Sequence, residues 1–119
     1  MTMNEINALA KEALKADDDW NVAQQVEGWG DEEMEKDYDQ VVDLLTPNGV
    51  KRDRSKVKIT HTDNCENDEQ FYDLYDELYN LEPIKMVKEY LRVYDVDGTR
   101  YAIEYSEGGA YAIFYYSAE

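Results

Sequence analysis

Carboxylates are the most frequent side chains in this sequence that could do chemistry. Asp and Glu number 28 in 119 residues, against 12 Lys and Arg, and the net charge at pH 7 is −16. Two carboxylates in one site can act as a general acid and a general base. In so acidic a chain, close pairs of carboxylates also arise by chance. Their presence alone therefore does not indicate a hydrolase.

The other reactive residue types give no recognisable site. His61 is the only histidine and Cys65 the only cysteine, so no catalytic triad and no cysteine-based metal site is visible. The acidic neighbour Glu66 disfavours a thiolate at Cys65. Asp95-Val96-Asp97-Gly98 superficially resembles a calcium loop but lacks its full spacing, and is typical of a hairpin turn. We predict a protein that is not an enzyme, with no catalytic residues, no metal site and no cofactor.

The placement of the acidic residues is more informative than their number. Residues 17–43 hold eleven acidic residues and one basic residue, and residues 63–82 hold eight acidic residues and no basic one. Helical spacing would align these carboxylates roughly every 5 to 6 Å. Two such helices side by side could present a row of charge like that of DNA, although sparser. The alternative interpretation is a solvated surface that only keeps the protein soluble.

We predict that the two acidic segments bind a basic partner. The predicted contact residues of the two segments are Asp31, Glu32, Glu35, Asp39 and Asp43, and Glu69, Asp73 and Asp76. Some of these acids, such as Asp39 and Asp43, stand one helical turn apart, which costs a few tenths of a kcal/mol. The net charge argues against direct binding to nucleic acid or to an anionic membrane.

A basic segment and a tyrosine-rich segment complete the pattern. Five basic residues lie between Lys51 and Lys58. We interpret them as an internal counter-charge for the acidic helices, and the alternative is a contact with a separate acidic surface. The last third of the chain alternates in polarity, with tyrosines on both sides of the expected strands. One sheet face should pack under the helices, and the other should expose tyrosines, which are favoured at interfaces. Tyr105 and Tyr115 are the candidate contact residues of that face. The alternative is that cross-strand tyrosine pairs only stabilise the sheet.

The periodicity predicts an α+β fold in which N-terminal helices pack on a C-terminal antiparallel β-meander. We expect helices over residues 4–16, 20–27, 31–45 and 68–80, one additional strand over 56–62, and the meander over 87–117. The expected strands of the meander are 87–96, 100–106 and 110–117, with turns at Asp97-Gly98 and at Glu107-Gly108-Gly109. Asp17 to Asp19 should cap the second helix.

All 119 residues are assigned to a single domain, with its helical part over residues 1–82. The sequence has no long apolar run that would suggest a signal peptide or a membrane span. With one cysteine, a reducing interior is the expected environment, and we predict a cytoplasmic protein. Strand edges of the meander could pair between chains, which leaves a homodimer open.

In size, acidity, acidic helices and tyrosine-rich strands, the chain resembles small phage or mobile-element proteins that mimic DNA, of the anti-CRISPR and anti-restriction types. Its segment Asp97-Gly98-Thr99-Arg100-Tyr101-Ala102-Ile103 is similar in style to strands in some of them. The resemblance is one of composition over the whole chain, so no functional residue is carried over. It implies an inhibitor that occupies the basic, nucleic-acid-binding surface of a host defence nuclease.

Two other functions fit the same sequence. An immunity or antitoxin protein that neutralises a basic toxin would share these electrostatics. An acidic protein-interaction domain without an inhibitory role, such as an assembly subunit, is the third hypothesis.

Overall fold

The computed structural model describes residues 1–14, 20–29, 31–61, 68–106 and 109–117. Its helices are α1 (Met3–Ala13), α2 (Val22–Trp29), α3 (Glu32–Leu45) and α4 (Asp68–Tyr79), with a short 3₁₀ helix, η2 (Arg54–Lys56). Its strands are β1 (Val57–His61), β2 (Lys85–Lys88), β3 (Leu91–Val96), β4 (Thr99–Ser106) and β5 (Gly109–Tyr116). The predicted α+β class is confirmed. The expectations for Asp17 to Asp19, for Cys65 and for the turn at Glu107-Gly108 lie outside the described residues.

The strands form one antiparallel sheet in the order β1-β5-β4-β3-β2. The additional strand β1 pairs with the C-terminal strand β5, with Ile59 opposite Phe114. The single strand expected over 87–96 is in fact two strands, because the chain turns at Glu89 and Tyr90. This turn contains no glycine or proline. The backbone N–H of Tyr105 donates to the carbonyl of Tyr90 across 2.7 Å, which fixes the turn against β4.

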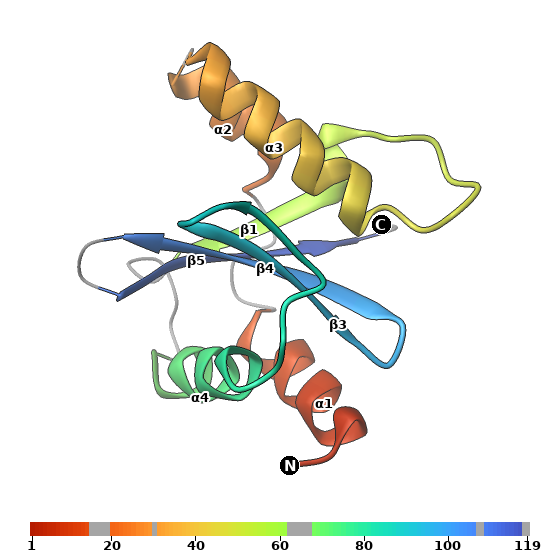
Figure 1. Cartoon of the computed structure of the whole chain (residues 1–119), viewed down its shortest axis with the longest axis vertical. Helices are drawn as coiled ribbons and strands as arrows, with labels where there is room; N and C mark the ends of the chain where they lie inside the picture. Colours follow the sequence, from red (N-terminus) through yellow and green to blue (C-terminus); the bar gives the residue numbers. More distant parts are fainter. Residues whose placement is uncertain (15–19, 30, 62–67, 107–108, 118–119) are drawn as a thin grey trace.

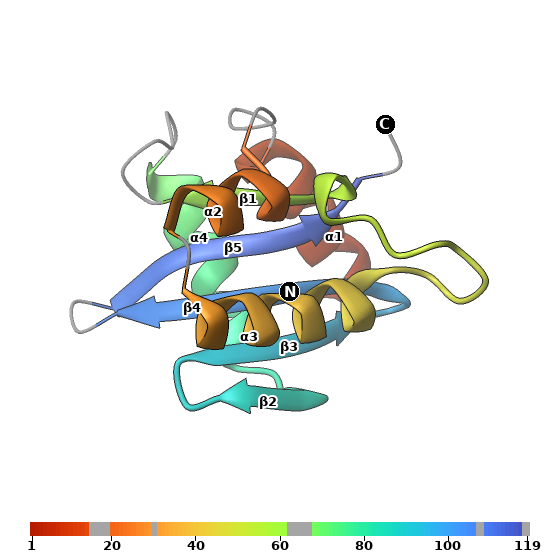
Figure 2. The ribbon, with the colours of Figure 1, turned by 90° about the horizontal axis from the view of Figure 1, so that it is seen from above.

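Helices cover both faces of the sheet, α1 and α4 on one and α2 and α3 on the other (Figures 1 and 2). Along β4, Tyr101 and Ile103 pack with α1 and α4, whereas Ala102 between them packs with α2 and α3. Alternate side chains of a strand point to opposite faces, so two apolar sets produce two cores. The expectation that one sheet face is bare and exposes tyrosines was therefore wrong.

Local signals explain where the elements begin and turn. Thr2 and Glu5 form a capping box at the start of α1, and the Asp31 carboxylate accepts from the backbone N–H groups of Glu33 and Met34 at the start of α3. Asp97 and Gly98 have φ angles of 53° and 90°, the left-handed conformation that a two-residue hairpin loop requires. The predicted turn between β3 and β4 is confirmed.

The two edges of the sheet differ. On the outer side of β1, the N–H of Ile59 donates to the carbonyl of Trp20 across 3.0 Å, so part of this edge is already paired. The opposite edge is β2, which carries Lys85 and Lys88. Lysines on an edge strand disfavour edge-to-edge pairing of sheets. Neither edge therefore favours the homodimer that the sequence left open, in which sheet edges pair between chains.

Candidate protein-binding surface

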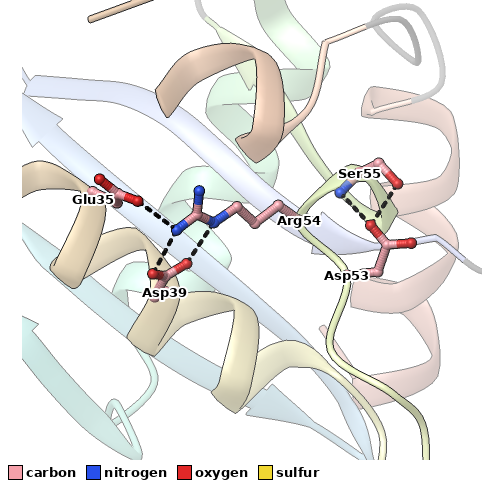
Figure 3. Close-up of polar contacts among 5 residues, drawn as sticks. All are labelled: Glu35, Asp39, Asp53, Arg54 and Ser55. Carbon is pink, nitrogen blue, oxygen red and sulfur yellow. Dashed lines mark hydrogen bonds and ion pairs between the residues drawn. The ribbon is translucent and has the colours of Figure 1, made fainter. Parts of the chain in front are cut away.

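The acidic row of α3 is largely paired with the basic segment of the same chain. Arg54 lies over α3 and binds two of its carboxylates (Figure 3). Its Nε and Nη2 donate to the two oxygens of Asp39, each across 2.7 Å, and Nη2 also donates to Glu35 across 2.8 Å. One turn further along, Arg52 Nε donates to Asp43 across 2.5 Å. The interpretation of these arginines as an internal counter-charge is confirmed.

The loop that carries Arg54 is itself held by a local carboxylate. Asp53 accepts from the backbone N–H of Ser55 across 2.9 Å and from its hydroxyl across 2.6 Å (Figure 3). Hydrogen bonds from Ser55 lower the pKa of the Asp53 carboxyl. The hydrogen bonds that Arg54 donates to Asp39 and Glu35 raise the pKa of its guanidinium, so its charge is permanent. The loop therefore presents a fixed cation to α3.

The other two predicted contacts of α3 lie at its start. Asp31 is the N-cap residue, and its carboxylate is occupied by backbone N–H groups of the first turn. Glu32 is exposed in that first turn, where the positive end of the helix dipole stabilises an acidic side chain. Most of these α3 carboxylates therefore stabilise the fold through hydrogen bonds and ion pairs. Only some of them face solvent as uncompensated charges.

The two acidic helices do not lie side by side. α3 covers one face of the sheet and α4 the other, with the whole sheet between them (Figure 1). The expectation that the two helices together present one row of charge was therefore wrong. Helical periodicity identifies the buried side of each helix, but it carries no information on which sheet face that side packs against.

The exposed side of α4 is acidic and carries two tyrosines. We define the α4 surface as Glu69, Tyr72, Asp73, Asp76 and Tyr79, all exposed. Spacings of three, four and seven residues place them on one side of the helix, away from buried Phe71, Leu74 and Leu78. The exposed fractions of Tyr72 and Tyr79 are 45% and 54%. Within the described part of the chain, no Lys or Arg forms an ion pair with the three carboxylates.

An aromatic cluster joins the α4 surface to the sheet. The ring of Tyr105 on β4 lies 5.9 Å from that of Tyr75 and 6.5 Å from that of Tyr79, measured between centroids. The guanidinium carbon of Arg92 lies 5.0 Å from the centroid of Tyr105, within the range of a cation–π contact. Burial raises the pKa of the Tyr105 hydroxyl, which also bonds that of Tyr94. This packing supports the position of Tyr79.

The two tyrosines of the sheet that were predicted as contacts lie in different parts of the structure. Tyr105 is half-buried beside α4, whereas the half-buried Tyr115 donates from its hydroxyl to the carbonyl of Leu14 across 3.2 Å, at the end of α1. The structure therefore brings Tyr105 to the α4 surface but not Tyr115. Tyr72 and Tyr79 were not among the contact residues predicted from the sequence. Their positions on the acidic side of a helical wheel of residues 68–80 could have identified them.

Other kinds of site receive no support from the described residues. Within them, no three His, Cys, Asp or Glu side chains are grouped so as to hold a metal ion. No helix in the described ranges is long and apolar enough to cross a membrane. Comparison of the chain with protein-family models, with curated proteins and with solved structures gives no match. The geometry of the surface is therefore the observation that bears on function.

Proposed function

We propose that the chain is an inhibitor that binds a basic, nucleic-acid-binding surface of a host defence nuclease of the CRISPR or restriction type. The α4 surface makes the contact, and its carboxylates take the place of phosphates. The observation that supports this is the row Glu69, Asp73 and Asp76, which has no cation partner in the described part of the chain, beside exposed Tyr72 and Tyr79. The partner would be met in the cytoplasm of the host cell.

The geometry of the row suits such a partner. A rise of about 1.5 Å per residue separates Glu69 from Asp73 by about 6 Å along the axis, and Asp73 from Asp76 by about 4.5 Å. Lysines and arginines that bind successive phosphates could bind carboxylates at this spacing. The exposed tyrosines add apolar area next to the charges, and tyrosine is a frequent anchor of protein interfaces. Charge attracts the partner, and the rings give contacts that salt does not screen.

The test is a DNA cleavage assay on a panel of CRISPR and restriction nucleases, with and without the chain. For an inhibited nuclease, affinity is then measured at low and high salt, and with competing DNA. The proposal predicts that affinity falls as salt rises and that DNA competes. Inhibition of none of the nucleases, or an affinity indifferent to salt, would overturn it.

A matched pair of variants locates the contact. The first carries Glu69→Gln, Asp73→Asn and Asp76→Asn on α4. The control carries Glu27→Gln, Glu32→Gln and Glu89→Gln, three exposed acids elsewhere, and has the same net charge. We expect the α4 variant to lose affinity by about tenfold or more, since each exposed charge pair contributes roughly 0.5–1 kcal/mol. An equal loss in both variants would mean that total charge, and not the α4 surface, determines binding.

The immunity hypothesis gives a different outcome in the same assay. A chain that inhibits a basic toxin but none of the defence nucleases would support neutralisation of a toxin. A chain that binds a basic protein without inhibiting it would support the third hypothesis, an interaction domain.

A further inference from the structure

A hollow of about 730 Å³ lies at the end of the sheet where β4 begins and β5 ends. The C-terminal half of α1, through Ala10 and Lys11, forms one wall together with Leu14 at its end. The end of α3 with the loop after it forms another, through Leu45 and Pro47. Tyr101, Tyr115 and Tyr116 supply aromatic rings. This volume lies within the range of pockets that bind small organic molecules.

The described lining of the hollow is positively charged, whereas the chain as a whole is acidic. Lys11 and Arg100 line it, and none of its described lining residues is an Asp or a Glu. Acidic residues make up 28 of the 119 residues of the chain, whereas the described lining of this hollow has two cations and no carboxylate. Arg100 is paired with Asp95, whose carboxylate is not among the described lining residues. Lys11 adds a second positive charge, so this lining favours an anion over a cation.

Two of the polar groups around the hollow, those of Arg100 and Tyr101, are already held in place. The Arg100 guanidinium donates to the carbonyl of Leu44 across 2.9 Å and to Asp95 across 3.1 Å. The Tyr101 hydroxyl donates to Asn7 across 2.8 Å. Lys11 is exposed, and within the described part of the chain it forms no ion pair. A pocket whose groups are fixed beforehand loses less entropy when a ligand binds.

We infer that this hollow binds a small organic anion with a planar ring, such as an aromatic carboxylate, sulfonate or phosphate. The ring lies among the tyrosines and the apolar residues, and the acidic group faces Lys11 and Arg100. This site is separate from the proposed inhibitory surface. None of the residues of the α4 surface lines the hollow, and α4 lies toward the other end of the sheet from the β3–β4 hairpin (Figures 1 and 2).

The net charge of the chain opposes the binding of an anion. A charge of −16 attracts cations and repels anions over the molecule as a whole. At physiological salt the screening length is about 8 Å, so the charges nearest to a ligand dominate. A site that prefers an anion therefore has to do so through its own lining.

The experiment compares two probes of similar shape and opposite charge, naphthalene-1-sulfonate and 1-naphthylmethylammonium, by their effect on backbone amide NMR signals. We expect the sulfonate to shift signals of Lys11, Thr99 to Tyr101 and Tyr115 to Ser117 in a saturable, single-site manner, and the ammonium compound to leave them in place. Equal binding of both probes in the hollow would overturn the inference. Shifts confined to exposed Tyr72, Tyr79 and Met86, or no binding of the sulfonate, would also overturn it.

Variants then test the role of the two cations. Lys11→Gln should weaken binding of the sulfonate by about fivefold, the effect of one exposed charge pair. Arg100→Gln should weaken it by about tenfold, because a guanidinium forms stronger hydrogen bonds to an anion. Lys88→Gln on β2 is the matched control, since it removes the same charge outside the hollow. If all three variants bind the sulfonate equally well, the anion is not bound by these cations.

Discussion

Arg54 binds Asp39 through two parallel hydrogen bonds, from Nε to Oδ1 and from Nη2 to Oδ2, each 2.7 Å long. The same Nη2 donates to Glu35, one turn earlier on α3. This contact draws the segment between α3 and β1 onto the acidic side of the helix. Much of the acidity of α3 therefore belongs to the internal electrostatics of the fold.

We expect Arg54→Gln to destabilise the protein by about 1 kcal/mol at low salt, because a two-point contact to one carboxylate and a bond to a second are lost together. Glu35 and Asp39 would then repel each other across one helical turn. Urea unfolding at low and high salt measures the effect, which should shrink as salt rises. The control is Arg52→Gln, which removes one exposed ion pair, to Asp43, and a long hydrogen bond to the carbonyl of Val50, and should cost less than half as much. Equal losses for the two variants would show that the two-point geometry is irrelevant.

A buried carboxyl group under α3 gives the fold a pH dependence. Glu104 is 7% exposed, and burial raises the pKa of its carboxyl above the ordinary value of 4.5, opposed by a 2.6 Å hydrogen bond from the Tyr38 hydroxyl. The stability that the raised pKa of Glu104 contributes is fully present below pH 4.5 and is lost as the pH rises through the raised pKa. We expect Glu104→Gln to stabilise the protein by about 1 kcal/mol at neutral pH, with no gain below the ordinary pKa. Urea unfolding across this pH range measures the difference.

The partner of Glu104 provides the opposite test. Tyr38→Phe keeps the ring beside Phe114 but removes the hydroxyl donor. Within the described residues, the other oxygen of Glu104 has no hydrogen-bond partner. Loss of the bond from Tyr38 would therefore leave the buried carboxylate without a hydrogen-bond donor among these residues. We expect a loss of about 1–3 kcal/mol at neutral pH and a smaller loss in acid, where the carboxyl is protonated. A loss independent of pH would contradict the assigned role of the carboxylate.

Two glycines should respond to the same substitution with opposite signs. Gly98 has a φ of +90°, which an alanine tolerates poorly, whereas Gly28 lies in helix α2 with nothing within 4 Å of an added Cβ. Gly98→Ala should destabilise the protein by about 1 kcal/mol or more, and Gly28→Ala should stabilise it by roughly 0.5–1 kcal/mol. Thermal unfolding of both variants is the measurement. Effects of the same sign would show that the hairpin or the helix differs from the structure described.

At alkaline pH the buried phenol of Tyr101 should limit stability. Burial raises the pKa of Tyr101 from 10 to about 12, so its contribution is complete below pH 10 and is lost as the pH rises towards 12. Tyr101→Phe should cost about 1 kcal/mol at neutral pH, because the bond to Asn7 is lost, and this cost should shrink above pH 10. Urea unfolding between neutral and alkaline pH follows the change. The control Tyr72→Phe, at an exposed position, should leave the stability at neutral pH nearly unchanged.

The sequence predicted the helices more closely than their arrangement. Helix α3 was expected over residues 31–45 and spans Glu32–Leu45 after its cap Asp31, because cap, apolar spacing and the Thr46-Pro47 end agree. The turn at Glu89 and Tyr90 was missed, since neither residue is a turn former and long-range hydrogen bonds hold it. The opposite positions of α3 and α4 depend on tertiary packing, which local periodicity does not report.

The candidate surface was predicted only in part. The acids of α4 follow from helical spacing, because a helix with one apolar side must expose the other. That the acids of α3 are paired with Arg52 and Arg54 depends on a loop that returns across the helix. The hollow beside Lys11 and Arg100 joins residues about ninety positions apart in the sequence, and the spacing of residues along the chain contains no sign of it.

The position of β5 between β1 and β4 has a consequence for synthesis on the ribosome. β1 ends at His61, but its neighbour in the sheet begins only at Gly109. At roughly 5–20 residues per second, several seconds separate the synthesis of the two strands. During this interval β1 and the inner side of α3 lack their central partner. The nascent chain is therefore exposed to proteases and chaperones until its last strand emerges, and the surplus of negative charge would keep such chains apart from one another.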